Sequence, residues 1–272
     1  MSEVKLQPAA TVTLVRDADD GIEVLMLQRN FRSGFMPGVY VFPGGALDAS
    51  DFSQEAMALC TGLDDAAASG ILKLERGGLA YWVAAIRESF EEAGLLLAYD
   101  ERGEIVSLKE PEPVERFGTY RRALNAGEQE FIAMLRAENL RLSVERLVFF
   151  SHWITPVGAP RRYDTRFFIA HAPDAQEVLH DNVETIGHRW VRPQAALSAH
   201  AAGGFKMRTP THRTLELFAQ YSTAGGLIEA LRTRGEIPAV LPRIAKDGRR
   251  VLPGEPGYDE AESAEGRGKW ET

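Results

Sequence analysis

The chain has 272 residues and a hydrophobic content of 44%, enough to bury a substantial core in one elaborated domain or in a domain with appendages. Its formal charge of -8 disfavours nucleic acid as a partner, and no apolar run approaches the roughly 20 residues that a membrane-spanning helix needs. Cys60 is the single cysteine, so an intrachain disulfide is excluded and a cytoplasmic location is expected.

The first half of the chain predicts a pair of strands and one strong helix. Residues 10–17 and 22–29 have strand-like apolar and β-branched content, and the sequence DADDG at 17–21 predicts a hairpin loop between them. Residues 79–94, LAYWVAAIRESFEEAG, have the apolar periodicity of a helix. Gly94 is expected to end that helix, because glycine readily adopts the left-handed conformation found at helix ends.

The second half predicts more helices and a return of strands. Residues 114–139 favour helix, the predicted strands are 146–155, 165–172 and 187–191, and two further helices are predicted at 193–200 and 212–222. The expected fold class is therefore α/β, with a mixed central sheet flanked by helices.

The expected organisation is a single domain over residues 1–235 with helical insertions at about 52–80 and 105–142. Residues 236–272 are assigned to a C-terminal extension. Its last 18 residues hold six acids and two bases, which is typical of a mobile solvated tail.

The helix at 79–94 carries an unusual acidic cluster. Glu88, Glu91 and Glu92 are three and four residues apart, so they are neighbours on the helix surface and repel one another. They also lie near the negative end of the helix dipole, where acids are penalised. One interpretation is a solvated acidic face, and the other is a cation-binding site.

The acidic helix, together with the glycines at 44 and 45, resembles the signature of the Nudix hydrolases. The second half of that signature is matched in order by Arg87, Glu88, Glu91, Glu92, Gly94 and Leu95. Gly45 matches its first glycine, and Asp51 stands where a glutamate is usual. The chain departs from the pattern by a serine at position 89 and by 35 residues between Asp51 and Arg87 in place of seven, an insertion of 28. Lengthening a loop costs only about 0.6 kcal/mol per doubling, so the insertion is tolerable.

The resemblance implies an α/β/α sandwich and a Mg²⁺- or Mn²⁺-dependent diphosphatase. By that resemblance Glu88 and Glu92 are the strongest metal ligands, followed by Glu91, with the Gly44 carbonyl completing the site. Arg87 is expected to pair with Glu91 one turn later rather than to touch substrate.

A further catalytic acid is expected from outside the signature. Glu184 is the candidate, because it lies just before a predicted strand and, in the implied fold, opposite the helix. The alternative is an ordinary exposed loop glutamate, in which case Glu177 and Asp181 come next.

The segments RSGFMPGVYVFPGG and HWITPVGAPRRYDTRFF resemble the peroxisomal coenzyme A diphosphatase subgroup of the Nudix family. That resemblance implies that Arg29 binds substrate. This chain has Gly34 where a second arginine is usual, and Arg32 is the candidate that takes over its contact with the substrate. The list of candidates for the 3'-phosphate of coenzyme A is Arg161, Arg162 and Arg166. The structural alternative is that Arg162 or Arg166 pairs with Asp164 and holds a turn.

The sequence therefore indicates a Nudix diphosphatase that hydrolyses coenzyme A or acyl-CoA to 3',5'-ADP and (acyl-)4'-phosphopantetheine. An ADP-ribose or NADH diphosphatase stays open as an alternative within the same class. A non-catalytic nucleotide-binding regulator is the alternative of another class. The expected partner is a small-molecule nucleotide substrate, with no membrane and a possible homodimer.

Overall fold

The structure is a computed structural model, and it describes residues 4–30, 37–179, 185–245 and 247–261. The strands are β1 (Leu6–Ala18), β2 (Gly21–Arg29), β3 (Tyr40–Val41), β4 (Gly44–Ala46), β5 (Ala98–Tyr99), β6 (Arg141–Leu142), β7 (Val148–Ile154), β8 (Arg162–His171), β9 (Thr185–Val191), β10 (Ala239–Val240), β11 (Arg243–Ile244) and β12 (Arg250–Val251). The α-helices are α1 (Gln54–Ala58), α2 (Asp65–Leu72), α3 (Leu79–Ala93), α4 (Pro111–Asn125), α5 (Phe131–Ala137), α6 (Pro193–Ala201), α7 (Thr209–Phe218) and α8 (Ala224–Arg232). Short 3-10 helices lie at Ala49–Phe52 and Val144–Arg146.

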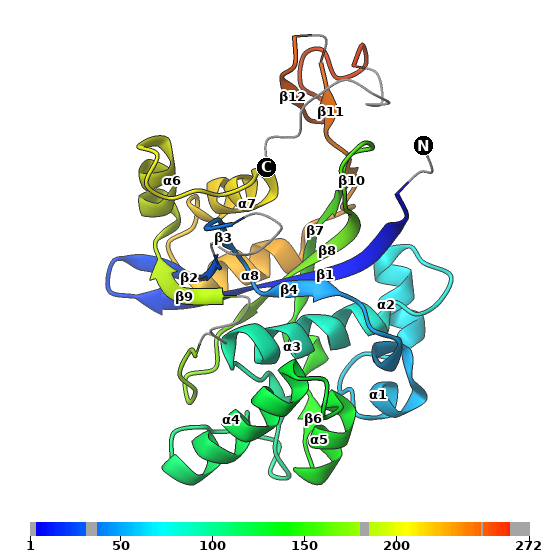
Figure 1. The fold of residues 1–272 in the computed structure, drawn as a ribbon, viewed down its shortest axis with the longest axis vertical. Coiled ribbons are helices and arrows are strands. Elements are labelled where there is room, and N and C mark those ends of the chain that lie inside the picture. Colours follow the sequence, from blue (N-terminus) through cyan, green and yellow to red (C-terminus); the bar gives the residue numbers. More distant parts are fainter. Residues whose placement is uncertain (1–3, 31–36, 180–184, 246, 262–272) are drawn as a thin grey trace.

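An eight-stranded mixed sheet runs through the centre of the molecule (Figure 1). Its main path follows the order β10-β7-β8-β1-β2-β3, with β4 paired to β1 and β9 paired to β2. The pairs β1–β8 and β7–β10 are parallel, and the other pairs in this sheet are antiparallel. The predicted hairpin is confirmed, because β1 and β2 pair up to Ala18 and Gly21 on either side of the turn.

The two faces of the sheet are covered by different sets of helices, and strand alternation explains how. Along β8, Phe168 and Ala170 pack on the side of α3, whereas Phe167 and Ile169 pack on the side of α6, α7 and α8. Successive side chains of a strand point to opposite faces, so an apolar run of this kind can fill two cores at once. The predicted α/β fold class with a mixed central sheet is confirmed.

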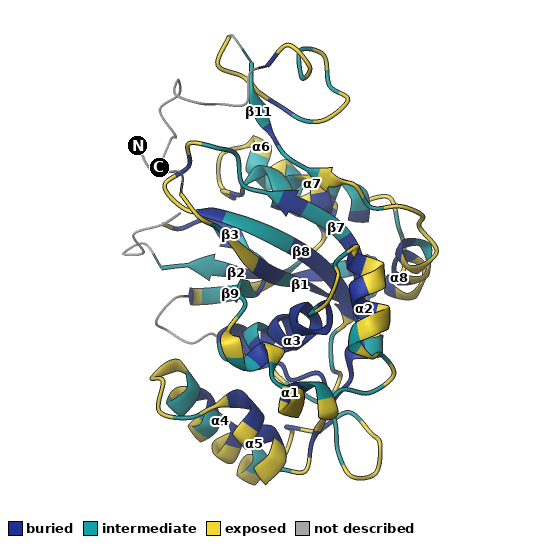
Figure 2. Ribbon diagram, turned by 90° about the vertical axis from the view of Figure 1, so that its right-hand side faces the viewer, coloured by how far each residue is buried: buried dark blue, intermediate teal, exposed yellow. Residues whose placement is uncertain are grey.

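Helix α3 is the most deeply buried helix at the sheet (Figure 2). It lies between the sheet and the α4–α5 pair, so most of its residues are buried rather than one stripe only. Gly94 follows it with φ of 73°, which confirms the predicted helix end.

The two predicted insertions contain helices. Helices α1 and α2 lie within 52–80, and α4 and α5 lie within 105–142. Several short strands were not predicted, and two further missed elements matter for the packing. Helix α8 packs on the face of the sheet opposite α3. Strand β10 lies in the segment assigned to the C-terminal extension, and it pairs with β7. Among the described helices, none combines the length and the apolar character that crossing a membrane requires.

The connection from α2 to α3 is closely packed at Gly78. Gly78 precedes α3, and a Cβ there would lie 2.4 Å from the backbone nitrogen of Ser69. Gly70, inside α2, has no atom within 4 Å of such a Cβ. Gly78→Ala should therefore lower the free energy of unfolding by about 1–3 kcal/mol through overpacking. Gly70→Ala should leave it unchanged or raise it by up to about 1 kcal/mol, because alanine favours helix. Urea denaturation of both variants checks this, and equal effects would contradict the packing argument.

Candidate active site

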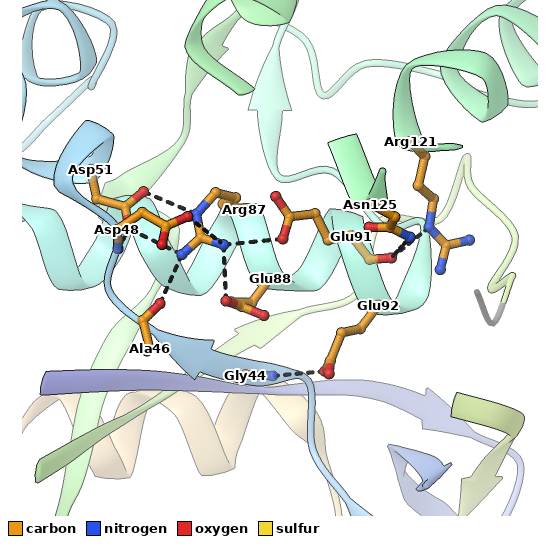
Figure 3. Close-up of polar contacts among 10 residues, drawn as sticks. All are labelled: Gly44, Ala46, Asp48, Asp51, Arg87, Glu88, Glu91, Glu92, Arg121 and Asn125. Carbon is orange, nitrogen blue, oxygen red and sulfur yellow. Dashed lines mark hydrogen bonds and ion pairs between the residues drawn. The ribbon is translucent and has the colours of Figure 1, made fainter. Parts of the chain in front are cut away.

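Two glutamates of α3 face the strand β4, which runs beside the helix (Figure 3). The Gly44 backbone nitrogen donates a hydrogen bond to Glu92 Oε2 at 3.0 Å. The Glu88 carboxylate packs against Gly45 so closely that a Cβ on Gly45 would lie 2.4 Å from Glu88 Oε1. Gly45 therefore lets Glu88 approach the strand, and a side chain there would push the carboxylate away, whereas a Cβ on Gly44 would meet Ala10 and Thr11 of β1.

Arg87 lies among the acids of the site and makes a dense set of contacts. Its Nη1 atom lies 2.9 Å from Glu88 Oε1 and 3.1 Å from Glu91 Oε2, which confirms the predicted pairing with Glu91. Its Nη2 atom donates to the Ala46 carbonyl at 3.0 Å. Arg87 itself is 4% exposed, so its guanidinium is positioned within the protein and does not extend into solvent.

Asp51 is the buried partner of Arg87. Its two carboxylate oxygens accept hydrogen bonds from Arg87 Nε and Nη2, each at 3.1 Å, and Asp51 is 1% exposed. The backbone nitrogen of Asp48 adds a further hydrogen bond at 2.8 Å. Asp51 lies within the predicted signature, but its pairing with Arg87 was not predicted. The carboxylate orients Arg87, and Arg87 in turn contacts Glu88 beside it and Glu91 one turn later.

The surroundings of the cluster disfavour the ionised form of its carboxylates. Burial raises the pKa of Glu88 to about 7, and the nearby Glu91 and Asp51 add to this, while Arg87 opposes it. Burial also raises the pKa of Glu91 and of Asp51 despite their contacts with Arg87. One guanidinium is thus not enough to compensate for three neighbouring buried or half-buried carboxylates.

The C-terminal end of α3 is closed by segments from elsewhere in the chain. The Glu91 carbonyl accepts hydrogen bonds from Arg121 Nε at 2.8 Å and from Asn125 Nδ2 at 3.3 Å, both on α4 (Figure 3). The Ala93 carbonyl accepts one from the Leu179 backbone nitrogen at 2.9 Å. Neither Arg121 nor Asn125 was singled out by the sequence analysis, since α4 is far away along the chain.

The structure places the predicted substrate arginines at different points of the sheet. Arg29 ends β2, where its Cα is paired with that of Thr185 in β9. Arg161 is exposed, while Arg162 is buried and its Nε donates to the Thr155 carbonyl at 3.2 Å. Arg32 and Glu184 lie outside the described residues.

Arg162 and the glycines at the site are separated along the sheet. Gly45 pairs with Ala10 of β1, whereas Arg162 pairs with Leu6, four positions earlier on the same strand. The offset amounts to roughly 13 Å along the strand direction at ~3.3 Å per residue. Only an elongated ligand could contact both places.

Arg166 takes part in a buried ionic cluster. It is 4% exposed, forms an ion pair with Asp164, and has its Nη1 atom 2.6 Å from His152 Nε2. These contacts hold the pKa of the Asp164 carboxyl below its usual range, even though burial alone would raise it. The predicted pairing of Arg166 with Asp164 is thus observed, although both residues lie in β8 rather than in a turn. The assignment of Arg166 to the substrate stays a prediction.

Two clefts in the described part of the chain lie away from the carboxylates. A cleft of about 920 Å³ has Trp82, His152 and Arg166 in its wall, and another of about 370 Å³ lies beyond the end of α3 against Leu95 and Trp190. None of the three glutamates of α3 lines either of these two cavities. We place the candidate active site at the glutamates, because the chemistry of the site depends on its acids rather than on the size of a cavity.

Comparison with known proteins identifies the family of the chain. The model of the NUDT19 Nudix domain matches residues 5–78 and 73–215. Acyl-coenzyme A diphosphatase NUDT19 from Xenopus laevis is 30% identical over 222 residues, which cover 71% of this chain and 58% of that protein. The human protein of the same name is 27% identical over 237 residues, covering 76% of this chain and 63% of that protein. The chain thus spans less than two thirds of the length of these two relatives.

A solved structure also supports the assignment of the chain to the Nudix hydrolases. A NUDIX hydrolase from Alicyclobacillus acidocaldarius is 26% identical and superposes with a TM-score of 0.67, over 85% of this chain and 99% of that one. The predicted family resemblance is confirmed, since the matched family model spans well over half of the chain. The chain belongs to the family described by the NUDT19 Nudix domain.

Proposed function

We propose that this protein is a divalent-metal-dependent Nudix diphosphatase acting on coenzyme A or acyl-CoA, with 3',5'-ADP and (acyl-)4'-phosphopantetheine as products. The observation that carries the proposal is the placement of Glu88 and Glu92 on one face of α3, directed at the glycines of β4. Membership of the NUDT19 Nudix domain family supports the reaction type. The names of the vertebrate relatives support the substrate class.

The donor set fits a hard divalent cation. Three carboxylates lie within little more than one helical turn, and oxygen ligands with negative charge are those that Mg²⁺ and Mn²⁺ prefer. The raised pKa of Glu88 points the same way, because a cation would remove the electrostatic penalty that this carboxylate carries.

Arg87 limits how that site can form. Within the residues that the structure describes, no group of three or more histidine, cysteine, aspartate or glutamate side chains is arranged to hold an ion. The reason is that Glu88 and Glu91 both contact Arg87 rather than converge with Glu92. Ion binding therefore requires Glu88 or Glu91 to rotate away from Arg87, while Asp51 keeps the guanidinium in place.

The residues then have separate roles in the proposed reaction. A bound divalent cation neutralises phosphoryl oxygens and lowers the pKa of its water. Glu88, Glu91 and Glu92 would hold the ion, with the Gly44 carbonyl as a further ligand, and a carboxylate of this set that is not bound to the ion would accept the proton of the attacking water. Arg87 would hold Glu88 and Glu91 beside the site until the ion binds, and it would then remain paired with Asp51.

Glu184 is kept in the proposal as a second acid. The proposal for Glu184 rests on the family resemblance and on its place in the sequence just before β9, because this residue lies outside the part of the chain that the structure describes.

The experiment that tests the proposed function is a screen with identified products. Coenzyme A, an acyl-CoA, dephospho-coenzyme A, ADP-ribose and NADH are each incubated with Mg²⁺ or Mn²⁺. Formation of 3',5'-ADP and 4'-phosphopantetheine at the highest kcat/KM supports the proposal. A preference for ADP-ribose or NADH would replace it with the other substrate class, and binding without any cleavage would indicate a nucleotide-binding regulator.

Glu92→Gln should lower kcat by on the order of 100-fold or more, because it removes one ligand charge at the reacting phosphate. The fold should be retained, since a glutamine side-chain oxygen can still accept the hydrogen bond from Gly44. Steady-state kinetics with saturating Mg²⁺ measures this. The matched control is Glu229→Gln, which changes an exposed helical acid on α8. Wild-type rates in the Glu92 variant would remove this residue from the site.

Arg161→Ala should raise KM for coenzyme A more than for dephospho-coenzyme A, because only coenzyme A carries the 3'-phosphate that a guanidinium would bind. We expect about a 10-fold difference between the two effects, the size of one charge-assisted hydrogen bond. Arg161 is exposed, so the substitution leaves the core intact. Arg249→Ala on the β11–β12 hairpin is the control. Equal losses on both substrates would assign Arg161 to another role.

The metal-free protein should lose stability as the pH rises from about 4.5 to about 7. The folded-state pKa of Glu88 is raised to about 7 from 4.5, so in this interval the folded state binds more protons than the unfolded state. The free energy of unfolding should fall by on the order of 3 kcal/mol, and the raised pKa values of Glu91 and Asp51 act in the same direction.

Denaturation of the protein in the presence of a chelator, at several pH values, measures this dependence of stability on pH. Glu88→Gln should flatten it, and saturating Mn²⁺ should reverse it because the ion favours the ionised carboxylates. A metal-free protein that gains stability between pH 5 and 7 would show that Arg87 fully compensates the acids.

A further inference from the structure

Helix α4 of the second insertion supplies hydrogen bonds that the end of α3 cannot make for itself. The last carbonyls of a helix have no N–H group four residues ahead of them. At the end of α3, the Glu91 carbonyl instead accepts from Arg121 Nε at 2.8 Å and from Asn125 Nδ2 at 3.3 Å (Figure 3). Two side chains one turn apart on α4 therefore hold the same backbone atom.

Packing brings α4 close enough for these contacts. The rings of Phe90 on α3 and Phe117 on α4 lie edge to face, with centroids 6.2 Å apart. Gly94 helps at the end of α3, since a Cβ there would lie 3.3 Å from Arg121 Nη1. Arg121 is 8% exposed, so its positive charge is held beside the negative end of the helix dipole, where a cation is favourable.

The carbonyl that α4 holds belongs to the residue just before Glu92. The direction of the Glu92 side chain depends on the backbone of this turn, and its carboxylate reaches β4 through the hydrogen bond from Gly44 at 3.0 Å. A change in the last turn of α3 would therefore move the carboxylate away from the glycines.

We infer that Arg121, assisted by Asn125, is a positioning residue for the active site: it fixes the last turn of α3 so that Glu92 faces Gly44. The inference rests on the proposed diphosphatase function for its catalytic consequence, and it assigns a role to the helical insertion at 105–142. Arg121 acts through the Glu91 backbone and does not touch substrate.

Hydrogen exchange of single amides tests the positioning without any activity measurement. Arg121→Ala should speed exchange of the Gly44 and Leu95 amides by about 10-fold or more, because the turn that holds their partners loosens. Arg122→Ala is the matched control, since Arg122 is the next residue on α4 but donates to Thr119 on its own helix. Faster exchange throughout α4 and α5 with an unchanged Gly44 amide would mean that Arg121 only stabilises the insertion, and would overturn the inference.

Kinetics tests the catalytic consequence. Arg121→Ala should lower kcat by about 10- to 100-fold with KM changed by less than about 3-fold, the size expected for a small misplacement of a catalytic group. Arg121→Lys should recover part of the loss, because it keeps the charge and one donor. Asn125→Ala, at an exposed position that cannot unfold the core, should lower kcat by about 2- to 5-fold.

The outcomes separate this inference from the proposed function. Folded Arg121→Ala and Asn125→Ala variants with wild-type kcat would overturn the positioning role while leaving the diphosphatase intact. If the wild-type protein cleaves no diphosphate, the proposed function fails, and exchange of the Gly44 amide still decides whether Arg121 positions Glu92.

Discussion

The buried contact between Asp51 and Arg87 is the interaction on which the rest of the site depends. Both carboxylate oxygens of Asp51 accept from the guanidinium, and both residues are almost completely buried. Removing one partner of such a pair leaves an uncompensated buried charge, which typically costs about 3–5 kcal/mol. With Asp51 in place, Arg87 has one nitrogen left to contact Glu88 and Glu91, so the acids of α3 are arranged around a fixed positive charge.

This arrangement explains how the signature tolerates a long insertion. Asp51 and Arg87 are 36 positions apart, and α1 and α2 lie between them. The ends of that segment are brought together by the ion pair and by packing of α2 on α3, where the Gly78 nitrogen donates to Ser69 Oγ at 2.9 Å. Because the entropic cost of a longer loop grows slowly, a packed insertion can lie inside the signature without separating its two halves.

The acids at the end of α3 are stabilised from several directions at once. Arg87 contacts Glu88 and Glu91 from one side, the Gly44 nitrogen contacts Glu92, and α4 holds the Glu91 carbonyl. None of these contacts fully offsets the burial of Glu88, whose pKa stays raised. That the site keeps its carboxylates close together at such an electrostatic cost supports the proposal that it binds a cation.

The sequence by itself determined the elements whose signals are local. The β1–β2 hairpin follows from alternating apolar residues around a turn, and the end of α3 follows from Gly94. The acidic set of Glu88, Glu91 and Glu92 could also be found in this way, because its members are neighbours on one helix. The pattern of strands and helices also predicted a mixed sheet, and the family resemblance added the α/β/α sandwich, but neither gave the order of the strands.

Only the tertiary structure decided the contacts between distant segments. The pairing of Asp51 with Arg87, the cluster of Arg166 with Asp164 and His152, and the contact of Arg121 with the Glu91 carbonyl join elements that are separated along the chain or lie on different strands. An arginine in the sequence has many possible carboxylate and carbonyl partners, and packing of the helices against the sheet selects among them. Helix α8 was missed for a related reason: it begins with AGG, which disfavours helix locally, and it is held by burial of Leu227 and Leu231 against the sheet.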